Sequence, residues 1–263
     1  MNELLEALPP DALVLDLGCA GGSFRASGKS LTVVRIDLEA AKPAMPNFAQ
    51  ADAARLPFRD HCFDLVVSNH SLEHFENLTG ALQEIGRVAK PSAALYVSVP
   101  DATTFTDRLY RWLARGGGHV NAFSSAEDLA ARIQAATRLK HVATRTLCTS
   151  LSFLNRKNSR TRRPRKLLLL GDGTQTSLHL FSFFSRLSDR WLHTRLSIYG
   201  WAFYFGNATA PIDRHPWTNV CIRCGSGHPS ESLRHVRVRR LFVPGYSCPD
   251  CGTWNFFAAD NLK

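Results

Sequence analysis

The sequence predicts an α/β protein with a doubly wound, mostly parallel sheet of seven strands and a small cysteine-rich module near the C-terminus. Short apolar segments end in glycine or polar residues and alternate with segments that carry apolar residues at helical spacing. This alternation is typical of parallel sheets covered by helices. With 263 residues, the chain is long enough to bury one substantial core and to fold a small additional module.

The elements of the first half follow from these patterns. Apolar segments predict five strands, at residues 13–17, 32–37, 47–50, 63–68 and 94–99. Residues 80–89 carry Leu82, Ile85 and Val88 at helical spacing, and Pro91 follows where a helix must end. A helix is therefore expected between the fourth and fifth strands.

The second half continues the alternation. Ser124 and Glu127 have the spacing of a capping box, which predicts a helix over residues 126–137. The remaining segments predict a strand at residues 142–154, a helix at 177–191 and an aromatic-rich strand at 196–205. We expect one domain over residues 1–209, with a basic insertion near 155–175, and a second domain over residues 217–257.

The net charge of +10 is concentrated in the second half of the chain. Residues 138–263 hold 20 Lys and Arg against 6 Asp and Glu, whereas residues 1–137 hold 12 against 16. The segment Arg156–Lys166 carries seven of these cations. Such a cluster favours an anionic partner, which could be a nucleic acid, a membrane surface or a phosphorylated substrate. A solvated basic face without a partner is the alternative.

A glycine-rich turn follows the first predicted strand, in the sequence Asp16-Leu17-Gly18-Cys19-Ala20-Gly21-Gly22. Ligands of open α/β sheets bind at the carboxyl ends of the strands, and glycines there allow close approach of the backbone. Asp16 can accept hydrogen bonds from a cationic amino group. Asp37, at the end of the second strand, is placed to accept two ribose hydroxyls.

Several motifs in this order and spacing resemble the class I methyltransferases, which use S-adenosylmethionine. They lie at residues 14–22, at Asp37, and at residues 50–58, 63–68 and 71–74. More narrowly, the chain is similar to the branch with small-molecule, quinone and natural-product methylating members. The resemblance covers residues 13–100 and continues weakly to about 206; it implies a Rossmann-like fold.

The resemblance also implies a cofactor site. Its residues are Asp16, Gly18, Ala20, Gly22, Asp37, Asp52, Ala53 and Asn69. By position, Asp16 and the turn would hold the methionine part, Asp37 the ribose, and Asp52 the adenine amino group. The chain departs from the family in two respects: Ala20 stands where a middle glycine is usual, and the first helix is unusually short.

Methyl transfer from a sulfonium requires mainly proximity and an in-line approach, but a hydroxyl or carbon acceptor also needs a base. Three histidines are candidates. His70 follows the fourth strand at the expected methyl position, His74 follows Glu73, and His119 follows three glycines. Each of them could equally be a hydrogen-bonded structural group. The Asn/Asp-Pro-Pro-aromatic signature of amino methylation on nucleobases is absent from the sequence after the fourth strand.

The seven cysteines fall into two classes. Cys19, Cys62 and Cys148 are isolated, in contexts typical of buried thiols. Cys221, Cys224, Cys248 and Cys251 form two Cys-x-x-Cys-Gly knuckles separated by 23 residues. Two such knuckles predict a tetrahedral zinc site in a three-stranded zinc ribbon, with iron or a redox dithiol as alternatives. A saturated site is structural, and we expect His228 and His235 to be surface residues.

The aromatic residues between 178 and 205 have two interpretations. They could line an apolar acceptor pocket or contact a membrane surface, but we expect ordinary core packing for most of them.

Three functions are compatible with these features. In order of preference they are an enzyme that methylates a small or lipid-like molecule, an enzyme that methylates rRNA or tRNA, and a cofactor-binding zinc protein that acts by docking. We expect a cytoplasmic protein, because the sequence has neither the features of a signal peptide nor an apolar run long enough to span a membrane. The acceptor, the methylated atom and the oligomeric state are not predicted.

Overall fold

The computed structural model describes residues 1–24, 30–40, 44–113, 118–148, 152, 155, 174–207, 217–238 and 242–257. The chain divides into two compact units. The first unit contains residues 1–100, 119–144 and 201–212, and the second contains residues 101–118, 145–200 and 213–263. The basic cluster at residues 156–166 lies outside the described residues.

The first unit is built on a sheet in which β1 to β5 run parallel. Its strands are β1 (Leu13–Leu17), β2 (Thr32–Asp37), β3 (Phe48–Gln50), β4 (Phe63–Asn69) and β5 (Ala89–Pro100), with parts of β6 (His141–Cys148) and β7 (Ile198–Gly206). The strand order is β3-β2-β1-β4-β5-β7-β6. β1 pairs in parallel with β2 and β4, β2 with β3, and β4 with β5. The carboxyl ends of these strands therefore share one edge of the sheet.

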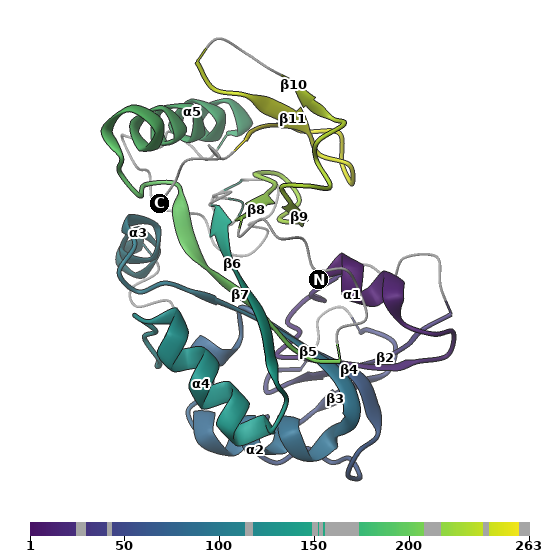
Figure 1. Ribbon diagram of the computed structural model, residues 1–263. Helices are drawn as coiled ribbons and strands as arrows, with labels where there is room; N and C mark the ends of the chain where they lie inside the picture. The colour runs from purple at the N-terminus through teal and green to yellow at the C-terminus, as the bar shows by residue number, and fades with distance from the viewer. Residues whose placement is uncertain are drawn as a thin grey trace. The chain divides into compact units, whose positions relative to one another are not determined.

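Helices α1 (Asn2–Ala7), α2 (Leu78–Val88) and α4 (Ala126–Thr137) belong to the same unit. α2 and α4 lie side by side (Figure 1). Gly86 permits this close packing, because a Cβ at this position would lie 2.8 Å from the Cα of Thr137. The predicted start of α4 is correct, but its cap is Ser125, not Ser124: the Ser125 hydroxyl accepts from the Asp128 amide at 3.1 Å.

The second unit combines two helices with short strands. Its elements are α3 (Phe105–Leu113), α5 (Gln175–Leu192), β8 (Trp217–Val220), β9 (Gly227–Pro229), β10 (Arg237–Val238), β11 (Gly245–Ser247) and β12 (Trp254–Phe256). β10, β11 and β12 form an antiparallel three-stranded sheet. α5 packs on β12, where the His179 ring nitrogen Nε2 lies 2.6 Å from the Trp254 carbonyl oxygen.

The structure differs from the sequence prediction in the strand count and in the boundary between the units. Within the described residues, the main sheet has nine strands instead of seven, because β8 pairs with the end of β6, and β9 pairs with β8. β8 and β9 hold only four and three residues, too few for a periodic pattern to reveal them. Residues 145–200, predicted to belong to the first domain, cluster with the C-terminal residues.

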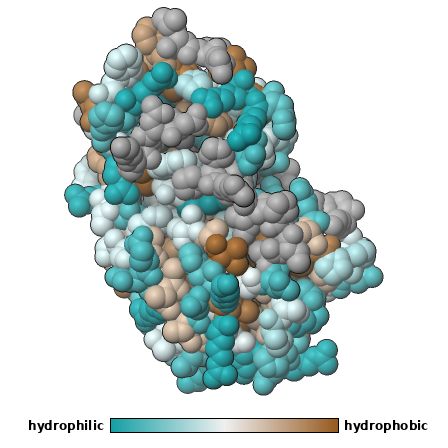
Figure 2. All heavy atoms as spheres, viewed as in Figure 1, coloured by the Kyte–Doolittle hydropathy of each residue, from teal (hydrophilic) through white to brown (hydrophobic). Residues whose placement is uncertain are grey.

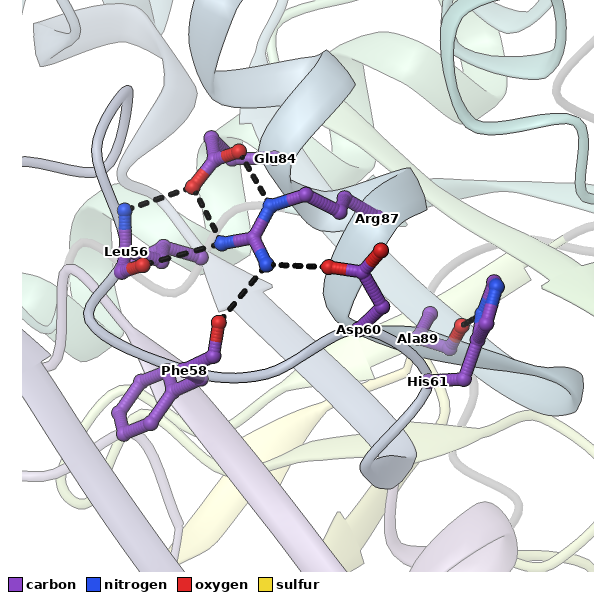
Figure 3. Close-up of polar contacts among 7 residues, drawn as sticks. All are labelled: Leu56, Phe58, Asp60, His61, Glu84, Arg87 and Ala89. Atoms are coloured by element: carbon purple, nitrogen blue, oxygen red, sulfur yellow. Dashed lines mark hydrogen bonds and ion pairs between the residues drawn. The ribbon is translucent and has the colours of Figure 1, made fainter.

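An arginine joins the loop after β3 to helix α2 (Figure 3). The Arg87 guanidinium donates to both carboxylate oxygens of Glu84, at 2.7 and 2.8 Å, and to Asp60 at 2.7 Å. It also donates to the carbonyls of Phe58 at 2.7 Å and Leu56 at 3.0 Å. Glu84 in turn accepts from the Leu56 amide at 2.8 Å. This network fixes the loop that begins near Asp52.

We expect Arg87→Leu to lower the free energy of unfolding by about 2 kcal/mol, because Glu84 and two loop carbonyls lose a charged donor. Arg132→Leu is the matched control, since this exposed arginine donates one bond, to Thr79 at 3.1 Å. The control should change the stability by less than about 0.5 kcal/mol. Urea denaturation measures both values, and equal effects would contradict the role given to Arg87.

Candidate active site

The glycine turn after β1 is closed by backbone hydrogen bonds. The amides of Gly18 and Cys19 donate to the Ile36 carbonyl at 2.8 and 3.1 Å, and the Gly22 amide donates to the Cys19 carbonyl at 2.6 Å. Gly18, Ala20 and Gly22 all have positive φ angles, of 68°, 44° and 98°. Three of the five residues from Gly18 to Gly22 therefore have a positive φ, a conformation that glycine adopts without strain. This explains why the turn is rich in glycine.

Gly18 also makes a close contact that excludes a side chain. A Cβ at this position would overlap the Ser71 side chain. Ser71 is buried, donates to the Leu17 carbonyl at 3.0 Å and lies 2.6 Å from the Ser68 hydroxyl. The turn after β1 is thus packed directly against the end of β4. Among the described residues, no atom lies within 4 Å of the Cβ positions of Gly21 and Gly22, so this half of the turn is open toward them.

Two carboxylates flank the turn. Asp16 is buried, and its Oδ2 accepts from the Ser23 amide at 3.0 Å. Its Oδ1 is buried without a hydrogen-bond partner among the described residues. Burial raises the pKa of Asp16 above its usual value. The Asp37 carboxylate, at the end of β2, accepts from the amides of Ala20 at 2.7 Å and Glu39 at 3.1 Å.

Two further predicted residues follow β3, the neighbour of β2 in the sheet. Asp52 is exposed, and its Oδ1 accepts from the Ala54 amide at 2.9 Å. Ala53 is buried in the core of this unit. Asp37 pairs with Gln50 in the β2–β3 register. Asp52 lies two residues after Gln50, so it stands at the same edge of the sheet as Asp37.

The end of β4 supplies Asn69 and His70. Asn69 accepts at its Oδ1 from the Ser98 hydroxyl at 2.7 Å, and the His70 amide donates to the Ser98 carbonyl at 2.9 Å. His70 has a φ of 54°, an unusual conformation for a residue other than glycine. Such conformations persist only where the surrounding contacts enforce them, and they cluster at functional sites.

The structure brings the three predicted histidines together around Glu73. The His70 Nδ1 lies 3.8 Å from the Glu73 Oε1, and the rings of His74 and His119 are 4.9 Å apart. Ligand atoms of Glu73, His74 and His119 all lie within 4.8 Å of one another. In the sequence, Glu73 stands out only as the neighbour of His74. Its burial, with 2% of the side chain exposed, could not be predicted from the sequence alone.

A backbone clamp positions His119 in this cluster. The amides of Val120 and Asn121 both donate to the Glu73 carbonyl, at 2.9 and 3.0 Å. The Asn121 side chain donates to the carbonyls of Leu72 at 3.0 Å and Phe75 at 2.7 Å. Asn121 is a positioning residue that the sequence analysis missed.

The electrostatics of this cluster keep His70 neutral at pH 7. Burial, followed by the charges of His119 and His74, lowers the pKa of His70 to about 4. The side chain keeps 31% of its surface exposed, so a neutral imidazole remains accessible at the end of β4. A neutral imidazole can accept a proton, whereas an imidazolium cannot.

The four paired cysteines meet in the second unit. Their sulfur atoms all lie within 4.8 Å of one another, and Cys221–Cys251 and Cys224–Cys248 are 3.7 Å apart. The two knuckles have matching turns, in which the amides of Gly225 and Gly252 donate to the carbonyls of the first cysteines at 3.0 and 2.8 Å. Cys19, Cys62 and Cys148 are buried free thiols, as predicted.

One prediction about this cluster is wrong. His228 is buried, and its Nε2 lies 3.5 Å from the Cys248 sulfur and 3.4 Å from the Asp250 carboxylate. The reason is that β9 pairs with β8, which carries the histidine back toward the second knuckle. His235 is exposed, as expected.

Residues 15–97 match the family model described as a methyltransferase domain. This segment of the chain is therefore a methyltransferase domain. The matched segment runs from β1 into β5, so it contains the glycine turn, both flanking carboxylates and the end of β4. This segment identifies an S-adenosylmethionine-dependent methyltransferase, as the motifs predict.

Characterised and uncharacterised proteins are similar to this methyltransferase. The chain is 28% identical over 186 residues to malonyl-[acyl-carrier protein] O-methyltransferase of Methylococcus capsulatus, covering 61% of this chain and 68% of that protein. It is 29% identical over 134 residues to the Pseudescherichia vulneris protein of the same name, covering 47% and 53%. Uncharacterized methyltransferase YodH of Bacillus subtilis is 41% identical over 106 residues, covering 35% and 45%. The chain thus spans between 45% and 68% of the length of these relatives.

The two halves of the glycine turn should respond differently to an added methyl group. Gly18→Ala forces a Cβ into Ser71 at a positive φ, so it should lower the free energy of unfolding by roughly 2 kcal/mol or more. Gly21→Ala, the matched control, meets open space and should stay within about 0.5 kcal/mol of the parent protein. Chemical denaturation tests this contrast, and a tolerated Gly18→Ala would disprove the packing of the turn on β4.

Proposed function

We propose that the chain transfers a methyl group from S-adenosylmethionine to a small or lipid-like acceptor. The observation that carries this proposal is the Asp16 carboxylate, which is buried beside a glycine turn with one oxygen unpartnered among the described residues. A buried anion of this kind is costly unless a cation pairs with it. The cationic amino group of the methionine moiety fits this requirement.

The other predicted residues fit the remaining parts of the cofactor. Each carboxylate oxygen of Asp37 has a second lone pair, so two ribose hydroxyls can still donate to it. The exposed Asp52 would accept from the adenine amino group, and Ala53 would offer its amide. Ala20 is compatible with the site because its positive φ is already adopted, so the loop keeps its shape without a middle glycine.

The side of the site at the end of β4 would receive the acceptor. When bound, the cofactor supplies an electrophilic methyl group on a sulfonium. His70, neutral at pH 7, would take the proton of a hydroxyl acceptor, and Asn69 would line the cleft. His119 and His74 remain candidates for the same role. Glu73 would act through them, since its carboxylate lies beside all three rings.

The relatives support a small acceptor. Two of them are named as O-methyltransferases of a malonyl group on an acyl-carrier protein. A carboxylate acceptor is already ionised at pH 7 and needs no strong base. This chemistry is compatible with a cluster in which the accessible histidine is only weakly basic.

Two alternatives are retained. The basic cluster at residues 156–166 favours RNA as the acceptor, and the cysteine module favours a protein that binds the cofactor and acts by docking. Nothing in the described residues places a nucleic acid at the β4 end of the site.

Cell-extract fractions incubated with methyl-labelled cofactor separate these functions. We expect label in small or lipid-extractable molecules, and this label should survive nuclease treatment because the acceptor is not RNA. Label that disappears with nuclease would instead support the RNA enzyme. Cofactor binding without label in any fraction would support the docking protein. Asp16→Asn is the matched negative control, since it removes the anion but keeps the size of the side chain.

For the C-terminal module we propose a structural zinc ion held by Cys221, Cys224, Cys248 and Cys251. A tetrahedral site with zinc–sulfur bonds of about 2.3 Å separates its sulfurs by about 3.8 Å. The Cys221–Cys251 and Cys224–Cys248 sulfur distances, both 3.7 Å, fit that geometry. Four thiolates leave no open position for catalysis. His228 would support the Cys248 side of the site from outside the ligand set. The proposed ribbon domain covers residues 217–257.

Purified protein should contain one zinc ion per chain by atomic absorption. Cys251→Ser should lose most of this zinc and lower the melting temperature, because metal binding contributes directly to the folding of such modules. Cys62→Ser, a buried thiol of the first unit, should keep the metal. Full zinc content in the Cys251→Ser protein would argue against a four-thiolate site.

A further inference from the structure

Helix α5 presents a stripe of apolar residues to solvent. Leu180, Phe184 and Trp191 have 56%, 60% and 64% of their surface exposed. With the half-buried Leu187 they recur at intervals of four, three and four residues, which places them in one stripe along the helix. Leu192, at the end of the helix, is 73% exposed. Figure 2 shows hydrophobic surface at the upper left, where Figure 1 places the C-terminal end of α5.

The opposite face of α5 is buried and mostly polar. It contains Leu178, Ser182, Ser185, Arg186 and Asp189. Asp189 accepts from the amides of Leu196 and Ser197, both at 2.8 Å, and from the Thr194 hydroxyl at 2.6 Å. These bonds hold the turn that follows the helix. They satisfy Asp189 on the buried face of α5, opposite the apolar stripe.

Helix α3 of the same unit is turned in the same way. Phe105 and Trp112 are 44% and 66% exposed, whereas Thr106 and Asp107 are buried. Asp107 accepts from the Arg111 side chain at 2.6 Å. The rings of Phe105 and Phe181 stack with centroids 6.4 Å apart, which joins the two helices. We use the name outer apolar face for the exposed apolar residues of these two helices, which are Phe105, Trp112, Leu180, Phe184, Trp191 and Leu192.

The exposed charges carried by α3, by α5 and by the turn after α5 are all positive. Residues 101–113 and 174–200 hold only three acidic residues, Asp101, Asp107 and Asp189, and all three are buried. The cations Arg108, Arg190 and Arg195 are exposed. An exposed face that combines Trp, Phe and Leu with arginines and lacks exposed carboxylates is typical of helices that lie in the interface of an anionic membrane.

We infer that the second unit binds the surface of an anionic lipid bilayer through the outer apolar face. A nucleic acid would use the arginines but would leave the apolar stripe without a partner. A lipid surface uses both, because acyl chains cover the apolar side chains and headgroup phosphates pair with the arginines. The contact is peripheral: within the described ranges, no helix has the length and apolar character needed to cross a membrane.

Membrane binding would hold the protein where lipid-like acceptors reside, and this narrows the proposed acceptor to the lipid-like class. That narrowing depends on the proposed function. Membrane binding itself does not, because it requires no turnover and involves no residue of the cofactor site.

Vesicle sedimentation with the zinc-loaded full chain tests the inference. We expect the protein to sediment with vesicles of phosphatidylcholine and phosphatidylglycerol in equal parts, and much less with phosphatidylcholine alone. The double variant Leu180→Ser/Phe184→Ser should lose binding by roughly tenfold, and Arg108→Gln should weaken it by a few-fold at low salt. Val142→Ser, an exposed apolar residue of the first unit at 45%, is the matched control and should bind normally.

A second measurement guards against unfolding of the variants. Brominated acyl chains should quench tryptophan fluorescence of the parent protein, and this quenching should fall in Trp191→Phe while zinc content and circular dichroism stay unchanged. Absence of binding to the anionic vesicles would overturn the inference. So would a dimer that the double variant dissociates while the vesicles stay unbound, because the face would then join two copies of the chain.

Discussion

The parallel pairing of β1 with β2 and β4 is the constraint on which the rest of the site depends. This pairing brings Asp16, Asp37 and Asn69 to one edge of the sheet, although they are far apart in the sequence. The amides of Gly18 and Cys19 extend the β1–β2 pairing into the turn by donating to Ile36. The contact of Gly18 with Ser71 then ties the turn to β4. A shift in any one pairing would separate the cofactor residues.

Much of this first unit could be predicted from sequence because its strands are short, apolar and bounded by glycine or polar residues. The carboxylates at the strand ends and the glycine turn were found for the same reason. The histidine cluster could be predicted only as separate candidates. His119 reaches Glu73 through a backbone clamp by Asn121, and such a contact between distant segments leaves no mark in local sequence.

The second unit was harder to predict, for two physical reasons. β8 and β9 are too short to show a pattern, and without them the burial of His228 beside Cys248 could not be expected. Periodicity also shows which residues share one face of an amphipathic helix, but it does not show whether that face is buried or exposed. Most of the aromatic residues between 178 and 205 were expected to pack in the core. Phe203 and Phe205 do so, whereas Phe184 and Trp191 face solvent.

Binding of the demethylated cofactor product tests the central claim most directly, because it probes the carboxylates and the turn without requiring the acceptor. Titration calorimetry of zinc-loaded protein with S-adenosylhomocysteine should show one site per chain, weakened by Asp37→Asn. A substitution in the cysteine module should leave this binding unaffected, because every predicted cofactor residue lies in the first unit. No heat for either S-adenosylhomocysteine or S-adenosylmethionine would contradict the account.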